Sequence, residues 1–303
     1  MLGAKVHTWN GEAAVTLTAG STTATFLPGC GMLCTSFRYD DDEYVAFPRP
    51  IAAFKAGAMT AFPLVHPWGN RLSRWGYRAA GRRVDLRGLE LPVDPGGLPI
   101  HGNLLGAPFE VTALGTNRLA ARLDYANSTE RLRAFPYRHT LDVDVRLSDG
   151  RLRVDTTVEP TADRPVPVSF CWHPYLHIPD APRRDWVLRW PACEHVLVDE
   201  HVIPTGARRG QAAQRAPLAR RTFDDHYALG ADRRFAVSAG GRTLTLTFDE
   251  HYPFAQLYVP RRGAFIAIEP MTARIDALGG DDAPICLPGE RFGARFTISV
   301  RRS

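Results

Sequence analysis

The stretch LDVDVRLSDGRLRVDTTV, residues 141–158, alternates apolar and polar side chains on both sides of the turn sequence Ser148-Asp149-Gly150. Alternation with a period of two gives a strand one apolar face, and an Asp-Gly pair favours a tight turn between two strands. We therefore predict an antiparallel hairpin over this stretch, with one of its faces buried.

The same pattern recurs toward the C-terminus. Residues 235–239 and 244–248 alternate around Gly240-Gly241, and residues 296–300 alternate again. No segment with a helical period is longer than two turns, and 24 prolines and 26 glycines interrupt the chain throughout. The sequence predicts a mainly antiparallel β fold, a large sandwich of two sheets.

We expect residues 1–303 to form a single domain. The chain is 45% apolar and 23% charged, near the averages for globular proteins, and all-β domains can reach this size. Residues 92–99 are rich in proline and glycine, and we interpret them as a loop because strand patterns continue on both sides.

The charge pattern bears on the class of partner. A net charge of +5 arises from 37 Lys and Arg against 32 Asp and Glu, with arginines scattered in pairs such as Arg208-Arg209. Nucleic-acid-binding proteins gather basic residues into a stripe, so we expect no nucleic-acid partner. Residues 1–15 lack the apolar core of a signal peptide, and no run of about 18 apolar residues occurs, so we expect no membrane partner.

The cysteines number five and form no CxxC pair. Neither a disulfide framework nor a thiolate zinc site is indicated, which favours a reducing cytoplasm. The ten histidines form no HxH or HExxH pattern, so we expect neither a metal nor another cofactor. The oligomeric state is left open by the sequence.

Several segments interrupt the strand pattern with polar side chains set among aromatic residues, prolines and glycines. They are residues 66–71, 100–103, 171–175, 223–227 and 268–272. His101, before Gly102, is either a turn histidine bonded to backbone or a functional group. The adjacent Asp224 and Asp225 are either a solvated turn or a functional carboxylate with its neighbour.

Glu269 and His173 carry the strongest chemical signal. Glu269 follows the apolar residues 265–268, which suggests a carboxylate at the mouth of a buried strand. Partial burial raises the pKa of a carboxyl group toward the range of a general base, although an ion pair with an arginine is the structural alternative. His173 lies among aromatic residues and is either a satisfied core histidine or a positioned acid.

Asn70 and Arg71 supply an amide and a planar guanidinium, groups that suit sugar hydroxyls. Arg71 could equally serve a structural ion pair.

Six motifs then follow one another along the chain. They are Asn70-Arg71-Leu72 with Gly76-Tyr77, His101-Gly102, His173-Pro174-Tyr175, Ile203-Pro204-Thr205-Gly206, Glu269-Pro270-Met271-Thr272 and Leu287-Pro288-Gly289-Glu290. Their order resembles that of the aldose 1-epimerase (galactose mutarotase) family. Any one motif arises often by chance, whereas six in order across most of a β-rich chain are specific.

The resemblance implies a β-supersandwich, a small-molecule sugar substrate and a catalytic pair. It assigns Glu269 as general base and His173 as general acid, with His101 beside the ring oxygen. It also implies that Arg71 and Asp224 hold sugar hydroxyls, with Asp225 as the alternative to Asp224. Asn70 is a further candidate anchor.

The chain departs from the family pattern at two places. Leu176-His177-Ile178-Pro179 follows the His-Pro-Tyr motif, where the family commonly has phenylalanine and then a polar residue. Ser73-Arg74-Trp75-Gly76 stands where an acidic or small residue is more usual. We expect these positions to border the sugar pocket, so the preferred sugar is not fixed by the resemblance.

Mutarotation opens a cyclic hemiacetal and needs one base and one acid at once. The base removes the proton of the anomeric hydroxyl while the acid protonates the ring oxygen, and both recover their state when the ring closes. Glu269 and His173 suffice for this chemistry. We expect Trp68, Trp172 or Tyr175 to stack on the apolar face of the sugar.

Three other functions fit parts of the sequence. A glycoside hydrolase would use Glu269 with Asp224 or Asp225 as its carboxylate pair. A noncatalytic carbohydrate-binding module would use the aromatic residues alone. A hexose-6-phosphate 1-epimerase would use arginines to bind the phosphate, and Arg74, Arg82 and Arg83 are the candidates.

Overall fold

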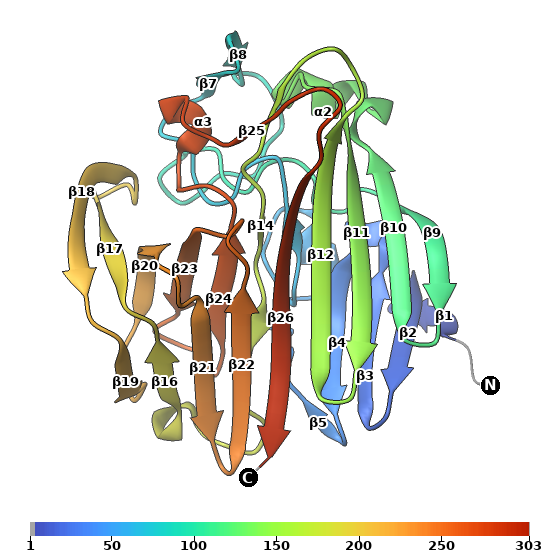
Figure 1. The fold of residues 1–303 in the computed structure, drawn as a ribbon, viewed down its shortest axis with the longest axis vertical. Helices are drawn as coiled ribbons and strands as arrows, with labels where there is room; N and C mark the ends of the chain where they lie inside the picture. The colour runs from blue at the N-terminus through green and yellow to red at the C-terminus, as the bar shows by residue number, and fades with distance from the viewer. Residues whose placement is uncertain (1–3, 303) are drawn as a thin grey trace.

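The computed structural model describes residues 4–302, which form mainly antiparallel sheets (Figure 1). The largest sheet has nine strands. Its order is β19 (Gln214–Pro217), β16 (Val187–Trp190), β21 (Arg234–Ala239), β22 (Arg242–Phe248), β26 (Phe292–Arg302), β12 (Arg151–Pro160), β11 (His139–Ser148), β10 (Arg118–Asp124) and β9 (Glu110–Gly115).

Two further sheets have eight and five strands. The eight-stranded sheet runs β18 (Pro204–Gln211), β17 (Cys193–Val198), β20 (Phe223–Leu229), β23 (Phe254–Val259), β24 (Ile266–Met271), β14 (Cys171–Trp172) and β6 (Leu64–Val65), with β15 (Tyr175–Leu176) also paired to β24. The five-stranded sheet runs β1 (Lys5–Trp9), β2 (Glu12–Ala19), β3 (Thr22–Leu27), β4 (Leu33–Tyr39) and β5 (Asp42–Glu43).

The remaining elements are short. There are two small two-stranded sheets: the hairpin of β7 (Gly76–Ala79) with β8 (Arg82–Asp85), and the long-range antiparallel pair of β13 (Val166–Pro167) with β25 (Ile285–Cys286). The helices are α1 (Ile51–Lys55), α2 (Thr129–Ala134), α3 (Ala277–Gly280) and the 3-10 turns Pro28–Cys30, Tyr125–Asn127 and Arg183–Asp185. Within residues 4–302, none of the helices has the length and apolar character needed to cross a membrane.

The predicted hairpins are confirmed. Strands β11 and β12 pair antiparallel down to Ser148 and Arg151, and their apolar residues are buried at every second position. Strands β21 and β22 pair around Gly240-Gly241, and β26 lies between β22 and β12. A period of two, bounded by turn residues, was sufficient to place these strands.

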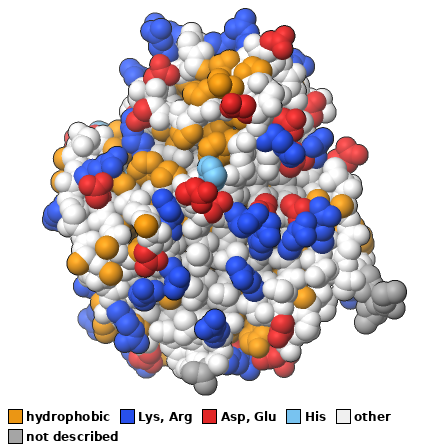
Figure 2. All heavy atoms as spheres, in the orientation of Figure 1, with side chains coloured by type: hydrophobic (Ala, Val, Ile, Leu, Met, Phe, Trp, Pro, Cys, Tyr) orange, Lys and Arg blue, Asp and Glu red, His pale blue; other side chains and the backbone are white. Residues whose placement is uncertain are grey.

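The predicted sandwich is also confirmed, but one of its layers is divided. The nine-stranded sheet packs against both other sheets. The ring centroids of Trp172 in β14 and Phe296 in β26 are 5.9 Å apart, and β11 contacts β2 and β3. The front of Figure 1 shows the nine-stranded sheet, with the others behind it. On its outer face basic and acidic side chains are intermingled (Figure 2), as in the pairs Arg122–Asp142 and Arg153–Asp155.

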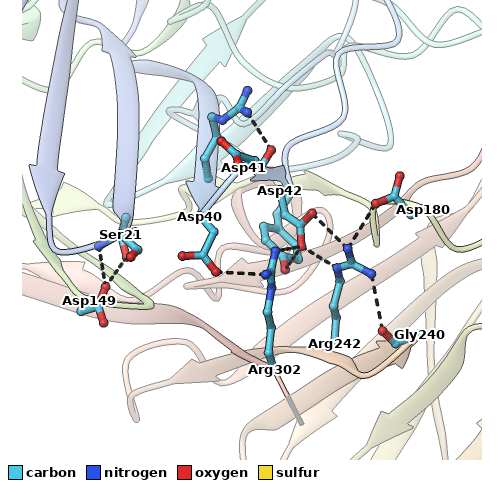
Figure 3. Close-up of polar contacts among 12 residues, drawn as sticks. Ser21, Asp40, Asp41, Asp42, Asp149, Asp180, Gly240, Arg242 and Arg302 are labelled. Carbon is cyan, nitrogen blue, oxygen red and sulfur yellow. Dashed lines mark hydrogen bonds and ion pairs between the residues drawn. The ribbon is translucent and has the colours of Figure 1, made fainter.

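A buried carboxylate links two of the sheets (Figure 3). Asp42 of β5 accepts hydrogen bonds from Arg242 of β22 and Arg302 of β26. The hydrogen bonds from Arg242, together with those from Arg302, lower the pKa of Asp42 to about 2. This cluster ties the edge of the five-stranded sheet to the centre of the nine-stranded sheet.

Candidate active site

Strand β24 divides its side chains between the core and a cleft. Ile266 and Ile268 point into the main core, whereas Ala267, Glu269 and Met271 lie on the opposite face. The same alternation along β23 places Gln256 directly across from Glu269. The apolar run before Glu269 therefore anchors the strand, and the carboxylate emerges on the other face of the sheet.

The cleft has a volume of about 140 Å³. It is lined by Met59, Asn70, Arg71, Ile100, His101, His173, Tyr175, Asp224, Gln256, Tyr258 and Glu269. All six residues that the sequence singled out for catalysis or binding thus lie in one cleft, although they are spread over 200 positions of the chain, from Asn70 to Glu269.

Glu269 and His173 form a buried pair. Oε1 of Glu269 lies 3.2 Å from Nε2 of His173, and the two side chains are only 2% and 6% exposed. The other carboxylate oxygen, Oε2, is buried and has no hydrogen-bond partner among residues 4–302. In that range no arginine or lysine pairs with Glu269, so the structural alternative of an arginine ion pair does not apply to the described residues.

The environment shifts both groups toward their neutral forms. Burial, assisted by the charge of Asp224 and opposed by Arg71, raises the pKa of Glu269 well above its usual value. Burial lowers the pKa of His173 to about 4. Because the two side chains are in contact, they titrate as a unit.

His101 is both a turn histidine and a cleft residue. Its φ is 61°, and the backbone N–H of Asn70 donates to its Nδ1 over 3.3 Å. The proton of the neutral ring therefore sits on Nε2. Burial lowers the pKa of His101 well below its usual value, and its ring lies 5.5 Å from that of His173.

Gly102 allows this turn to approach the preceding loop. A Cβ atom at position 102 would lie 2.3 Å from the carbonyl oxygen of His66, and the φ of Gly102 is 62°. Only glycine fits such a backbone contact, which holds the His101 loop beside residues 66–71.

Arg71 forms a structural ion pair and still lines the cleft. Its Nε donates to Asp94 over 2.6 Å, and its Nη1 donates to the side-chain oxygen of Asn70 over 3.0 Å. The two interpretations of Arg71 from the sequence are therefore compatible.

The faces of β20 separate Asp224 from Asp225. Asp224 lines the cleft and accepts a 2.6 Å hydrogen bond from the amide of Gln256. Asp225 is not among the cleft residues, and its carboxylate lies 3.1 Å from Nε2 of His195. Adjacent residues of a strand point to opposite faces, so only one of the two can reach the cleft.

Three cleft residues were missed by the sequence analysis, Met59, Gln256 and Tyr258, while Ile100 lies in the segment 100–103 singled out there. Gln256 is 1% exposed within the otherwise apolar strand Phe254–Val259. A lone amide in an apolar strand was the available signal, since a buried polar side chain needs partners.

One of the three aromatic candidates for stacking lines the cleft, whereas the positions that depart from the family pattern do not border it. Trp68 and Trp172 are buried in the main core, and the indole N–H of Trp172 donates to Thr156, so of the three aromatic candidates only Tyr175 lines the cleft. None of the positions at which the chain departs from the family pattern, residues 73–76 and 176–179, borders it.

The arginines considered for a phosphate under the alternative function lie outside the cleft. Arg74 and Arg83 line a separate surface hollow beside β7 and β8, and Arg82 donates to the carbonyl of Pro136. None of the three reaches the cleft.

Neither a disulfide nor a metal-binding cluster is formed within residues 4–302. All five cysteines are free and buried. Across residues 4–302, no group of three or more His, Cys, Asp or Glu side chains is arranged to hold a metal ion.

Comparison with known proteins adds a family match. A family model described as aldose 1-epimerase matches residues 13–299. No curated protein matches the sequence.

Solved structures share the fold at low sequence identity. A galactose mutarotase-like protein from Clostridium acetobutylicum is 14% identical, with a TM-score of 0.87 over 99% of this chain and 98% of that one. Galactose 1-epimerase from Lactobacillus acidophilus is 14% identical, with a TM-score of 0.77 over 100% and 98% of the two chains. An aldose epimerase homologue from C. elegans is 18% identical, with a TM-score of 0.79 over 95% and 98%.

Proposed function

The chain belongs to the aldose 1-epimerase family, and from this membership we propose that it interconverts the α and β anomers of a free aldose. The observation that carries the proposal is the buried Glu269 carboxylate, with one oxygen beside His173 and the other unpartnered among residues 4–302. In a cyclic aldose, the hydroxyl to be deprotonated and the oxygen to be protonated are bonded to the same carbon. A base and an acid that lie side by side match this arrangement.

Ring opening follows from this pair. Oε2 of Glu269 accepts the proton of the anomeric hydroxyl, while the proton shared by Oε1 and His173 passes from Nε2 to the ring oxygen. The C1–O5 bond breaks, the carbonyl forms, and rotation about C1–C2 presents its other face. The pair holds one proton before and after, so the reverse transfers close the ring without a further reactant.

The other cleft residues serve the sugar's remaining groups. Arg71, Asn70 and Asp224 offer donors and acceptors for hydroxyls away from C1, and Tyr175 offers an aromatic face. The Nε2–H of His101 is a second donor for the ring oxygen. Holding the sugar by its distal end leaves C1 free to rotate.

The alternatives are less well supported by this site. A glycoside hydrolase places two carboxyl groups across the scissile bond, whereas the group beside Glu269 is a histidine. A binding module gains nothing from a buried carboxylate oxygen without a partner, which costs about 1–3 kcal/mol. An acid–base function accounts for this cost.

We propose a free rather than a phosphorylated aldose. Arg71 is the only Lys or Arg among the cleft residues, and its charge is already balanced by Asp94. Asp224 and Glu269 add acidic groups. A phosphate, with a charge of about −1.5 to −2 at neutral pH, would meet no uncompensated cation there.

Two broader proposals accompany this function. Residues 1–303 act as one domain, since the cleft draws on residues from Met59 to Glu269 and the family match spans residues 13–299. The cytoplasm is the proposed location, because free buried cysteines suit a reducing compartment.

Polarimetry tests the proposal. Freshly dissolved α-D-glucose and α-D-galactose should reach equilibrium rotation faster with wild-type protein, and Glu269→Gln should abolish the acceleration. Asp225→Asn, on the opposite face of β20, is the matched control and should retain activity. Acceleration of glucose 6-phosphate alone would favour the phosphorylated substrate, and binding of free sugar without acceleration would favour the binding module.

A further inference from the structure

The carboxylate of Asp94, which lies outside the cleft, holds the side chain of Arg71. Asp94 lies in the loop between β8 and β9, which closes on itself through the hydrogen bonds Asp94 N to Leu98 O and Ile100 N to Pro92 O, of 3.0 and 2.9 Å. Oδ1 of Asp94 accepts a further 2.9 Å bond from the N–H of Leu98. The carboxylate is thereby fixed relative to the backbone of its own loop.

The other oxygen of Asp94 holds Arg71. Oδ2 accepts the hydrogen bond from Nε of Arg71 over 2.6 Å, and the two side chains are 7% and 13% exposed. This shielding from water makes the pair stronger than a surface ion pair. Burial alone would raise the pKa of Asp94, but the hydrogen bonds from Arg71 and from the N–H of Leu98 outweigh it, so that pKa is lowered. Asp94 itself does not line the cleft.

Two contacts then fix the plane of the guanidinium. Nε is held by Asp94 and Nη1 by the side-chain oxygen of Asn70, which also accepts the backbone N–H of Arg71 over 2.9 Å. Nη2 has no hydrogen bond to any of residues 4–302, although Arg71 lines the cleft. A guanidinium is planar, so two fixed nitrogens determine where the third points.

We propose that Asp94 is a positioning residue for sugar binding, which acts through Arg71 by orienting its free Nη2 toward a hydroxyl of the bound aldose. The inference rests on the proposed function. An unrestrained arginine loses rotamer entropy when it is fixed, and the ion pair with Asp94 removes much of that loss before the sugar binds. The paired charge also suits a neutral hydroxyl better than an anion.

The simpler alternative is that Asp94 only closes its loop through Leu98. The two roles differ in what Asp94→Asn does. The amide can still accept from the N–H of Leu98, but its other end then places an N–H against Nε of Arg71, so the loop contact survives while the arginine is released.

The test is a double-mutant cycle in the mutarotation assay. Asp94→Asn should raise KM about tenfold with kcat within about threefold of wild type, the pattern expected when binding common to ground and transition states is lost. Arg71→Met should raise KM at least as much. The double variant should equal Arg71→Met alone, because Asp94 has no effect without the arginine. Asp94→Glu, which keeps the charge, should recover part of the loss.

Asp42→Asn is the matched control, since Asp42 is a buried carboxylate paired with two arginines, and none of the three residues lines the cleft. It should lower the melting temperature and leave KM unchanged. Effects of Asp94→Asn and Arg71→Met on KM that simply add, or an unchanged KM in Asp94→Asn, would overturn the positioning role.

Calorimetric titration of galactose into Glu269→Gln separates this inference from the proposed function. If wild type binds galactose without accelerating mutarotation, the proposed function fails, and a raised Kd in Asp94→Asn/Glu269→Gln still supports the role of Asp94. An unchanged Kd in that variant refutes it. Absence of any aldose binding by wild type refutes both.

Discussion

Asp224 raises the pKa of Glu269, although the two carboxylates come from strands β20 and β24, with β23 between them. Burial is the larger cause, and Arg71 acts in the opposite direction. The residues that we propose to anchor the sugar therefore also tune the proposed base. We therefore expect substrate binding and proton abstraction to be electrostatically linked in this cleft.

The alkaline limb of the pH profile should report this linkage. The proposed active pair shares one proton, so kcat/KM should fall as that proton is lost, through a midpoint above 4.5, the ordinary glutamate value. Asp224→Asn should move the midpoint down, because the charge that favours the protonated form is gone. Arg71→Met should move it up. Shifts of the same sign in both variants would contradict the assignment of Glu269 as the base, and Asp225→Asn should leave the midpoint in place.

The acid should be separable from the ring-oxygen donor. His173→Gln should lower kcat by about 10²–10⁴, the usual contribution of one positioned acid, with a smaller change in KM. His101→Gln should cost less, because its N–H only assists at the ring oxygen. Polarimetry at saturating sugar gives both values. A larger loss of kcat in His101→Gln than in His173→Gln would exchange the two roles.

Stability should fall in acid because of buried histidines outside the proposed chemistry. Nε2 of His66 lies 2.9 Å from Nε2 of His139, whose Nδ1 donates to Tyr137 O over 2.8 Å. Burial lowers the pKa of His139 to about 4 and that of His66 well below 6.5. Below pH 6.5 the unfolded chain binds protons that the folded chain does not.

The free energy of unfolding should therefore decrease from pH 6.5 toward pH 4, by about 1.4 kcal/mol per pH unit for each histidine. Urea unfolding at several pH values measures this slope. His139→Gln keeps an acceptor for His66 and removes one titrating group. The free energy of unfolding of this variant should therefore change less steeply with pH, by up to about 1.4 kcal/mol per pH unit. Equal slopes in the two proteins would show that this pair does not govern acid stability.

The Asp42 cluster predicts a second loss at lower pH. Asp42 has a pKa of about 2 in the folded chain against 3.8 as the ordinary value, so its contribution is complete above pH 3.8 and disappears as pH falls through about 2. Asp42→Asn should cost about 2–4 kcal/mol at pH 7, because it leaves two arginines without their shared partner. Chemical unfolding tests this magnitude, and an unchanged midpoint would mean that Arg242 and Arg302 find other partners.

Much of the fold was available from local pattern. The period of two over residues 141–158 placed β11 and β12, and the apolar run before Glu269 placed β24. The division of the second layer into two sheets was not predicted, because the pattern of a strand shows that one face is buried but not which sheet covers it.

The candidate site was predictable only in part for the same reason. The sequence supplied the residue types and the order of the motifs, but Asp224 and Asp225 were equivalent until the faces of β20 were known. Trp68 and Trp172 were plausible stacking residues until their burial in the main core was seen. Gln256 carried a sequence signal as a lone amide in an apolar strand, but its place across from Glu269 was known only from the strand register.

The sequence by itself determined the β class, the hairpins, the family resemblance and the chemical groups at Glu269 and His173. Only the tertiary structure decided which of those groups meet, which aspartate enters the cleft, and that Asp94 holds Arg71. The reason is physical. Alternation and turn preference act between residues close in the chain, whereas the 3.2 Å contact of His173 with Glu269 depends on the pairing and packing of strands nearly a hundred residues apart.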